Sequence, residues 1–207
     1  MARLNVNPTR MELKKLKARL STAVRGHKLL KDKSDEMVRR FTIILREDKK
    51  LRDEVEKELA ETLKQFSVAR SVTPAYAAET AFLMPTVAVQ AECGTQSIMG
   101  VDAPKIELIE EKRTDGLPYA YSEITSEADY SVERVSKLLP RLLQLAAVEK
   151  AVRLLADEIE RNKRRVNALE YIMIPQLEET IKYIRDKLDE NERAAIVRLM
   201  KVKGKSN

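Results

Sequence analysis

Hydrophobic residues recur every three or four positions over two long stretches of the chain. The first stretch begins near Asn7 and keeps this alternation for more than six heptads, and the second runs from about Leu138 to Val202. Such a period is typical of a helix that lies against another helix. The predicted seam positions are Leu13, Leu16, Leu20, Ala23, His27, Leu30, Ser34, Met37, Phe41, Ile44, Asp48, Leu51 and Val55 in the first stretch, and Leu145, Val148, Val152, Leu155, Ile159, Asn162, Val166, Leu169 and Met173 in the second.

The pattern predicts a mainly α protein in which the N- and C-terminal helices form a long antiparallel two-helix coiled coil. Stretches of about sixty residues, at about 1.5 Å per residue, would extend on the order of 90 Å. The middle of the chain is expected to form a small helix and a β-hairpin. We therefore divide the chain into an N-terminal long helix (1–70), a short helix with a hairpin or loop region (71–125), and a C-terminal long helix (126–207).

Capping signals suggest where the first helix begins. The Asn7–Pro8 pair favours one start, and Thr9 with Glu12 forms a competing capping box two residues later. From either start the helix should run to about Arg70. Gly26 interrupts it, and we expect a closely packed neighbour there rather than a hinge.

The middle of the chain carries turn and strand signals. Thr73 and Pro74 predict a short helix over Pro74–Leu83. Beyond it, the β-rich runs Thr86–Ala91 and Gln96–Val101 flank Gly94, with a third candidate run at Lys105–Glu111. We expect a small hairpin or meander.

Two prolines mark the last long helix. Ser126 is the expected cap, a kink or restart is expected at Pro140, and the helix should then run to about Lys203 with Pro175 inside it. Around Pro175 the apolar spacing widens to four residues at a time. Such a stutter relaxes the left-handed supercoil locally.

Composition agrees with paired helices rather than a thick core. Aromatic residues make up 4% of the chain and charged residues 35%, with five Gly and no Trp. The net charge is +6, but the bases gather near both ends while the middle is acidic. If the long helices are antiparallel, both basic ends meet.

Signals for membranes or disulfides are weak. Cys93 is the single cysteine, and no apolar run approaches the length that spans a membrane. The basic N-terminus lacks the apolar core of a signal peptide. We expect a cytoplasmic protein without direct membrane insertion.

The sequence offers little chemistry. It has no glycine-rich phosphate loop, no metal-spaced His or Cys set and no nucleophile with a matching base, so we expect no catalytic residue, cofactor or metal. Nucleic acid is not expected as a partner, because the bases surround a helix that keeps its seam and aromatic stacking residues are scarce. The polar seam residues are interpreted as setting the helix register; they are His27, Ser34, Asp48 and Asn162.

Three strings carry a resemblance to a known family. They are LNVNPTRMELKKLKARL from Leu4, RGHKLLKDKSDEM from Arg25, and RRVNALEYIMIPQLEETIKYIRDKLDENER from Arg164. Together they resemble the D subunit of the vacuolar and archaeal-type (V-type and A-type) rotary ATPases, in particular its prokaryotic members. The resemblance covers roughly Leu4 to Phe41 and Glu149 to Lys203.

The resemblance implies a non-catalytic axle present in one copy per complex. Such a central-stalk component transmits torque between ATP turnover in the head and H+ or Na+ transport in the membrane sector. Its implied partners are the catalytic A and non-catalytic B subunits, the F subunit of the central stalk, and the C subunit, which sits on the membrane rotor. The implied location is peripheral, on the cytoplasmic face of the cell membrane.

Two surfaces are proposed from charge and excess apolar residues. Bases expected to face the head are Arg3, Arg10, Lys14, Arg193, Arg198, Lys201 and Lys203. Apolar residues beyond one seam, expected to face the F subunit, include Leu143, Ala146, Ala147 and Ala151. The alternative is a prefoldin-like chaperone or scaffold protein, which also joins two helices through β-hairpins. It would self-assemble, or pair with a sister chain, through its β-structure.

Overall fold

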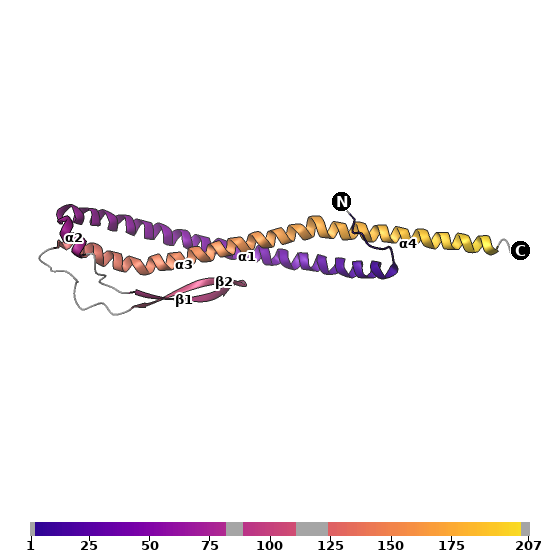
Figure 1. The fold of residues 1–207 in the computed structure, drawn as a ribbon, viewed down its shortest axis with the longest axis horizontal. Coiled ribbons are helices and arrows are strands. Elements are labelled where there is room, and N and C mark those ends of the chain that lie inside the picture. The colour runs from indigo at the N-terminus through magenta and orange to yellow at the C-terminus, as the bar shows by residue number, and fades with distance from the viewer. Residues whose placement is uncertain (1–2, 82–88, 111–123, 204–207) are drawn as a thin grey trace. The chain divides into compact units, whose positions relative to one another are not determined.

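The computed structural model describes residues 3–81, 89–110 and 124–203 (Figure 1). In chain order it contains α1 (Arg10–Val72), α2 (Ala75–Ala81), β1 (Val89–Ile98), β2 (Val101–Glu110), α3 (Ser126–Ala168), the π-helix η1 (Leu169–Met173) and α4 (Ile174–Lys203). The chain forms two compact units. Unit 1 combines Met1–Glu36 with Ile159–Asn207, and unit 2 is Met37–Glu158.

In unit 1 the start of α1 runs antiparallel to the helices that end the chain. Arg10 pairs with Glu192, and His27 Nε2 lies 3.3 Å from Glu170 Oε2. Later residues of α1 therefore pair with earlier residues of η1 and α4, as expected for antiparallel helices. Both basic ends of the chain belong to this unit, as the charge distribution suggested.

Unit 2 repeats the antiparallel arrangement between the rest of α1 and α3. Arg52 Nη2 lies 2.5 Å from Glu149 Oε1, and Arg134 Nη1 lies 3.3 Å from Glu61 Oε2. The predicted mainly helical fold, with long N- and C-terminal helices that pack together, is confirmed.

The core of unit 1 is a narrow apolar seam. Leu16, Leu177, Ile181 and Ile184 are buried, and Leu13, Leu20, Ala23 and Leu188 pack against them. Unit 2 buries Met37 and Leu155 completely and Val55 and Leu138 almost so. The three-and-four spacing of these side chains places them on one face of their helices.

Thr9, from the competing capping box, rather than Asn7, caps α1. The Glu12 amide donates a hydrogen bond to Thr9 Oγ1 at 3.2 Å, and α1 begins at Arg10. The segment before it was not foreseen as part of the core. Its Leu4 and Val6 pack on the seam cluster of unit 1, and the Leu4 amide donates to Thr180 Oγ1 at 3.2 Å.

The predicted stutter coincides with η1. There the Ile174 amide donates to the carbonyl of Leu169, five residues back. Pro175 has no N–H for the carbonyl of Tyr171, and its ring would crowd that oxygen in a regular α-helix. One wider turn accommodates both effects. It also turns Met173 outward to 40% exposure, so the predicted seam position of Met173 is wrong.

Pro140 does not restart the last long helix. It lies inside α3, which continues through it. Leu138 and Ala151 are buried on either side, and their packing favours continuation over a helix end. Ser126 is the first residue of α3, and the carbonyl of Thr125 accepts from the Ala128 amide.

In the middle of the chain, the short helix and the hairpin are both present. The Pro74 carbonyl accepts from the amides of Ala77 and Ala78, which starts α2 as the sequence predicts; the expected end of that helix, Leu83, lies outside the described residues. Strands β1 and β2 pair antiparallel, with Ile98 opposite Val101.

The hairpin turns later than the sequence suggested. Gly94 lies within β1, and the turn is formed by Met99 and Gly100, with φ of 56° and 84°. A two-residue turn of this kind needs positive φ at both positions, which Gly supplies without strain. The expected breaks at Gly94 and before Lys105 are therefore wrong.

Candidate interaction surfaces

The described residues hold no grouped ligands for a metal. Nowhere among residues 3–81, 89–110 and 124–203 do three His, Cys, Asp or Glu side chains gather closely enough to bind an ion. None of the described helices combines the length and apolarity needed to cross a membrane. The candidate sites are interaction surfaces on the two units.

Three of the polar seam residues lie in unit 1. Ser34 is 6% and Asn162 1% exposed, so both are inside the helix pairing. His27 is half-buried and faces Glu170 from η1, with 18% of its side chain exposed. A slipped register would separate these side chains from their present surroundings, which is the physical basis for the proposed register role.

Asp48 is the fourth polar seam residue and lies in unit 2. Its Oδ1 atom is buried and has no hydrogen-bond partner among the residues that the structure describes. Arg52 lies one turn away, and its pKa is raised mainly by its hydrogen bond to Glu149, with a smaller contribution from Asp48. An unpaired buried oxygen destabilises the folded state, so Asp48 costs stability at this position.

Of the bases predicted to face the head, Arg3 and Arg10 are engaged within unit 1. Arg3 lies over the Tyr183 ring at 4.6 Å and near Glu179, while Arg10 pairs with Glu192. These contacts hold the start of the chain against α4. Both side chains remain more than half exposed, so they are also open to a partner.

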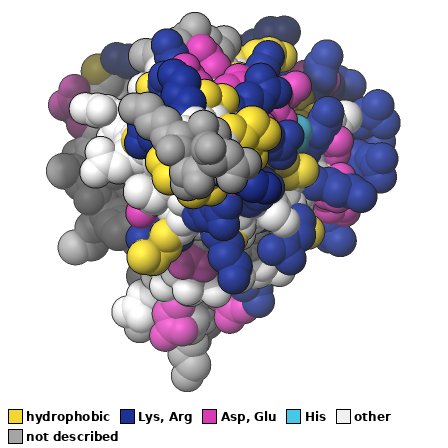
Figure 2. Space-filling model, turned by 90° about the vertical axis from the view of Figure 1, so that its right-hand side faces the viewer, with side chains coloured by type: hydrophobic (Ala, Val, Ile, Leu, Met, Phe, Trp, Pro, Cys, Tyr) yellow, Lys and Arg dark blue, Asp and Glu magenta, His cyan; other side chains and the backbone are white. Residues whose placement is uncertain are grey.

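The last turns of α4 carry the other predicted bases beside exposed apolar side chains. Lys14 on α1 is exposed as well. In the view of Figure 2, dark-blue Lys and Arg side chains and yellow hydrophobic side chains share the face turned to the viewer. The predicted bases in these turns, all exposed, are Arg193, Arg198, Lys201 and Lys203, and the large apolar side chains beside them, 49–70% exposed, are Ile196, Val197, Leu199, Met200 and Val202.

The π-helix adds a second apolar surface to unit 1. Tyr171 and Ile172 are 61% and 56% exposed.

A Cβ placed on Gly26 would meet nothing within 4 Å, so the closely packed neighbour expected there is absent among the described residues. The surface around Gly26 is open, and sequence spacing alone gave no sign of this.

The residues predicted to face the F subunit divide into two kinds. Leu143 and Ala147 are half-buried and Ala146 is exposed, so part of each is available on the surface of unit 2. Ala151 is 6% exposed and belongs to the unit's own core. Large apolar side chains on α1 of this unit are also exposed, including Leu45 at 41% and Leu63 at 57%.

The hairpin exposes a polar face. Glu92 lies directly opposite Glu107 across the two strands, and Lys105 Nζ lies 2.5 Å from Glu107 Oε1. The hydrogen bond and charge of Lys105 lower the pKa of Glu107, which favours the ionised carboxylate even with Glu92 beside it. Cys93 is exposed on β1.

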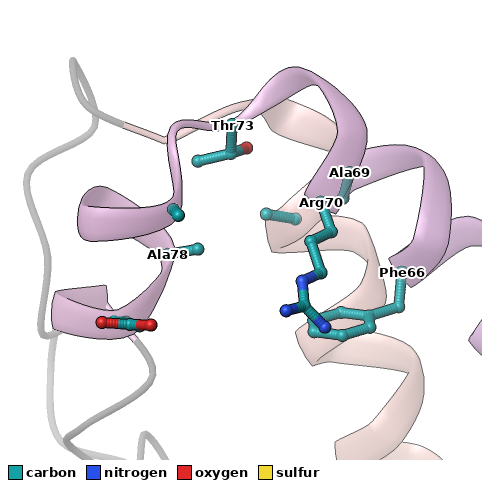
Figure 3. Close-up of a pocket in the computed structure, with 8 residues that line it drawn as sticks. Phe66, Ala69, Arg70, Thr73 and Ala78 are labelled. Atoms are coloured by element: carbon teal, nitrogen blue, oxygen red, sulfur yellow. The ribbon is translucent and has the colours of Figure 1, made fainter.

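A cavity of about 220 Å³ lies in unit 2 where α1 ends and α2 begins (Figure 3). Phe66, Ala69 and Arg70 line it from α1, and Ala78 faces them from α2. The remaining lining residues are Thr73, Ala75, Glu79 and Ala128. Sequence reasoning did not find this cavity, because it depends on how α2 folds back beside α1.

Paired long helices with exposed basic and apolar surfaces define the class, a mainly helical protein whose surfaces are open to partners. Comparison with known proteins identifies the protein family. The family model for the ATP synthase D subunit matches residues 12–204, and the chain belongs to this family.

Named relatives match almost the whole chain. The D subunit of the V-type ATP synthase of Clostridium novyi (strain NT) is 51% identical over 206 residues, which cover 98% of this chain and 95% of the relative. Its counterpart in Thermoanaerobacter sp. (strain X514) is 49% identical over 203 residues, covering 98% and 97%. That of Clostridium botulinum (strain ATCC 19397 / Type A) is 50% identical over 204 residues, covering 97% and 94%.

Replacing Asp48 should reveal its cost. We expect Asp48→Leu to raise the free energy of unfolding by about 1 kcal/mol, because it removes a buried oxygen without a partner and adds apolar contact in the seam. Urea denaturation measures the change. Asp53→Leu, at an exposed position further along the same helix, is the matched control and should change stability by less than about 0.5 kcal/mol. Equal effects of the two substitutions would refute the assignment.

Proposed function

We propose that this protein is the central axle of a V- or A-type ATP synthase and transmits torque between the catalytic head and the ion-transporting membrane sector. The observation that carries the proposal is the near-complete match, at about half identity, to the D subunit of V-type ATP synthases. The protein catalyses nothing by itself in this proposal. ATP and the transported H+ or Na+ are handled by other components of the complex.

The antiparallel helix pairs support this role physically. A shaft must resist sliding of one helix along the other when it is twisted. Buried polar groups such as Asn162 and Ser34 oppose slippage, because a shifted register would bury them against apolar partners. A single asymmetric chain also presents a different face in each direction, which lets one axle act differently on repeated sites around it.

Unit 1 is the proposed bearing inside the head of A and B subunits. The last turns of α4 combine exposed apolar side chains with the bases Arg193, Arg198 and Lys201. Exposed ion pairs are weak and screened by salt, which suits a contact that must form and break during rotation. Arg3, Arg10, Lys14 and Lys203 complete the proposed set.

Unit 2 is the proposed binding region for the F subunit. Leu143, Ala146 and Ala147 lie on α3, and all three leave apolar surface uncovered. Ala151 supports this surface from within the core. The C subunit of the membrane rotor is the remaining proposed partner, and the complex places one copy of this chain peripherally at the cytoplasmic face of the membrane.

Rotation can be tested by locking the axle. Ile196→Cys, in a Cys93→Ser background, accepts a photo-crosslinker joined through a cleavable disulfide. Illumination of the assembled complex should stop ATP hydrolysis, because the turning shaft becomes fixed to the head, and reduction should restore it. The unilluminated complex is the control. Hydrolysis that continues at full rate after complete crosslinking to the head would contradict an axle.

Neutralising the bases of α4 should weaken the bearing. With about 0.5 kcal/mol for each exposed ion pair, changing Arg193, Arg198 and Lys201 together to Gln should lower affinity for the head about tenfold. The difference should shrink in high salt. Titration of the head with labelled chain gives the affinity. The matched control changes three exposed bases of unit 2, Lys49, Lys50 and Lys57, to Gln and should leave head affinity unchanged.

Charges placed on the α3 surface should disrupt binding of the F subunit. Leu143→Glu combined with Ala147→Glu buries two unpaired carboxylates if a partner covers them, and we expect co-purification of the F subunit to be lost. Leu29→Glu, at a position 70% exposed in unit 1, is the control. Undiminished recovery of this partner with the double variant would place its binding surface elsewhere. Recovery of multimers of this chain alone would instead favour a chaperone-like scaffold.

A further inference from the structure

The cavity between α1 and α2 has an apolar floor and two charges on its walls. Its lining includes four alanines and Phe66, together with Arg70 from α1 and Glu79 from α2. Its volume of about 220 Å³ exceeds the ~150 Å³ of an apolar cavity that accommodates benzene. One bulky apolar side chain therefore fits.

The two charges are not used within the described chain. Arg70 and Glu79 are both exposed, and neither forms an ion pair with a described residue. Arg70 also stands in the last turn of α1, where the helix dipole favours a cation. The helix dipole does not explain the second charge. Glu79 lines the cavity from α2, opposite Arg70 on α1.

The end of α1 and the start of α2 also expose apolar side chains that do not line the cavity. Val68, Val72 and Tyr76, neighbours in sequence of the lining residues, are 54%, 64% and 74% exposed. A small ligand would be satisfied by the cavity alone and would need none of this surface. Protein interfaces characteristically surround an anchoring pocket with apolar and aromatic side chains, Tyr among them.

From these observations we infer that the cavity is a socket for another protein, which inserts one bulky apolar side chain flanked by an acidic residue for Arg70 and a basic residue for Glu79. The inference rests on the proposed function only in that the partner is sought among the other proteins of the complex. The charges fix the orientation of the inserted segment, since reversing it would bring like charges together. The apolar anchor supplies the affinity.

Filling the socket tests the inference in the assembled complex. The chain carrying Ala78→Leu replaces the native chain, and native mass spectrometry measures which partners remain bound. We expect one partner to bind at least tenfold more weakly while the head stays associated. Ser67→Leu adds the same side chain at an exposed α1 position outside the cavity and should have no effect. Melting temperatures of both variants verify folding.

Charge variants test the two walls separately. Arg70→Gln and Glu79→Gln should each weaken the same partner about fivefold, and Arg70→Lys should recover most of the loss. Lys64→Gln, an exposed base on α1 outside the cavity, is the control. A full complement of partners with Ala78→Leu and with both Gln variants would overturn the socket.

A photo-crosslinking amino acid at Ala78 identifies the occupant. A crosslinked peptide of another protein of the complex, with an apolar residue between an acid and a base, is the expected result. Crosslinks confined to this chain, or to a second copy of it, would overturn the inference. Failure of the axle proposal has a different signature, because the native chain would then fail to enter the head at all.

Discussion

Burial of a narrow apolar seam between antiparallel helices is the interaction on which the rest of the structure depends. Leu16 meets Leu177, Ile181 and Ile184 in one unit, and Met37, Val55 and Leu155 fill the other. Helices this long are stabilised mostly by such packing rather than by their intrinsic propensity. Because the seam is only one side chain wide, most other residues remain in water, which explains why so charged a chain folds without a thick core.

A narrow seam also leaves the helix register poorly determined by apolar contacts alone. The polar side chains inside it and the ion pairs along its edges supply the missing specificity. Asn162 is almost fully buried, and Arg52 with Glu149 links α1 to α3 at a defined level. Each surface ion pair contributes little stability, but a shift by one turn would break several of them together. Register is therefore specified at some cost in stability, as Asp48 illustrates.

The proposed interaction surfaces consist of side chains that the helix seam does not bury. The last turns of α4, the surface of α3 near Leu143 and the cavity beside α2 all present groups that the helix pairing leaves uncovered. For a component of a larger assembly, such uncovered groups are where partners bind. The family match and the distribution of these surfaces both support the proposed role, in which the protein acts through contacts with its partners.

The sequence by itself determined the helices, most of the seam, the start of α2 and the family, because each depends on residues close together in the chain or on a long matching string. Tertiary structure decided the rest. The π-helix before Pro175 turned Met173 out of the seam, and the hairpin turned at Met99 and Gly100 rather than at Gly94. Leu4 and Val6 joined the core of unit 1, and the cavity formed where α2 folded back. These features depend on backbone geometry and on contacts between residues far apart in sequence, neither of which a local periodicity records.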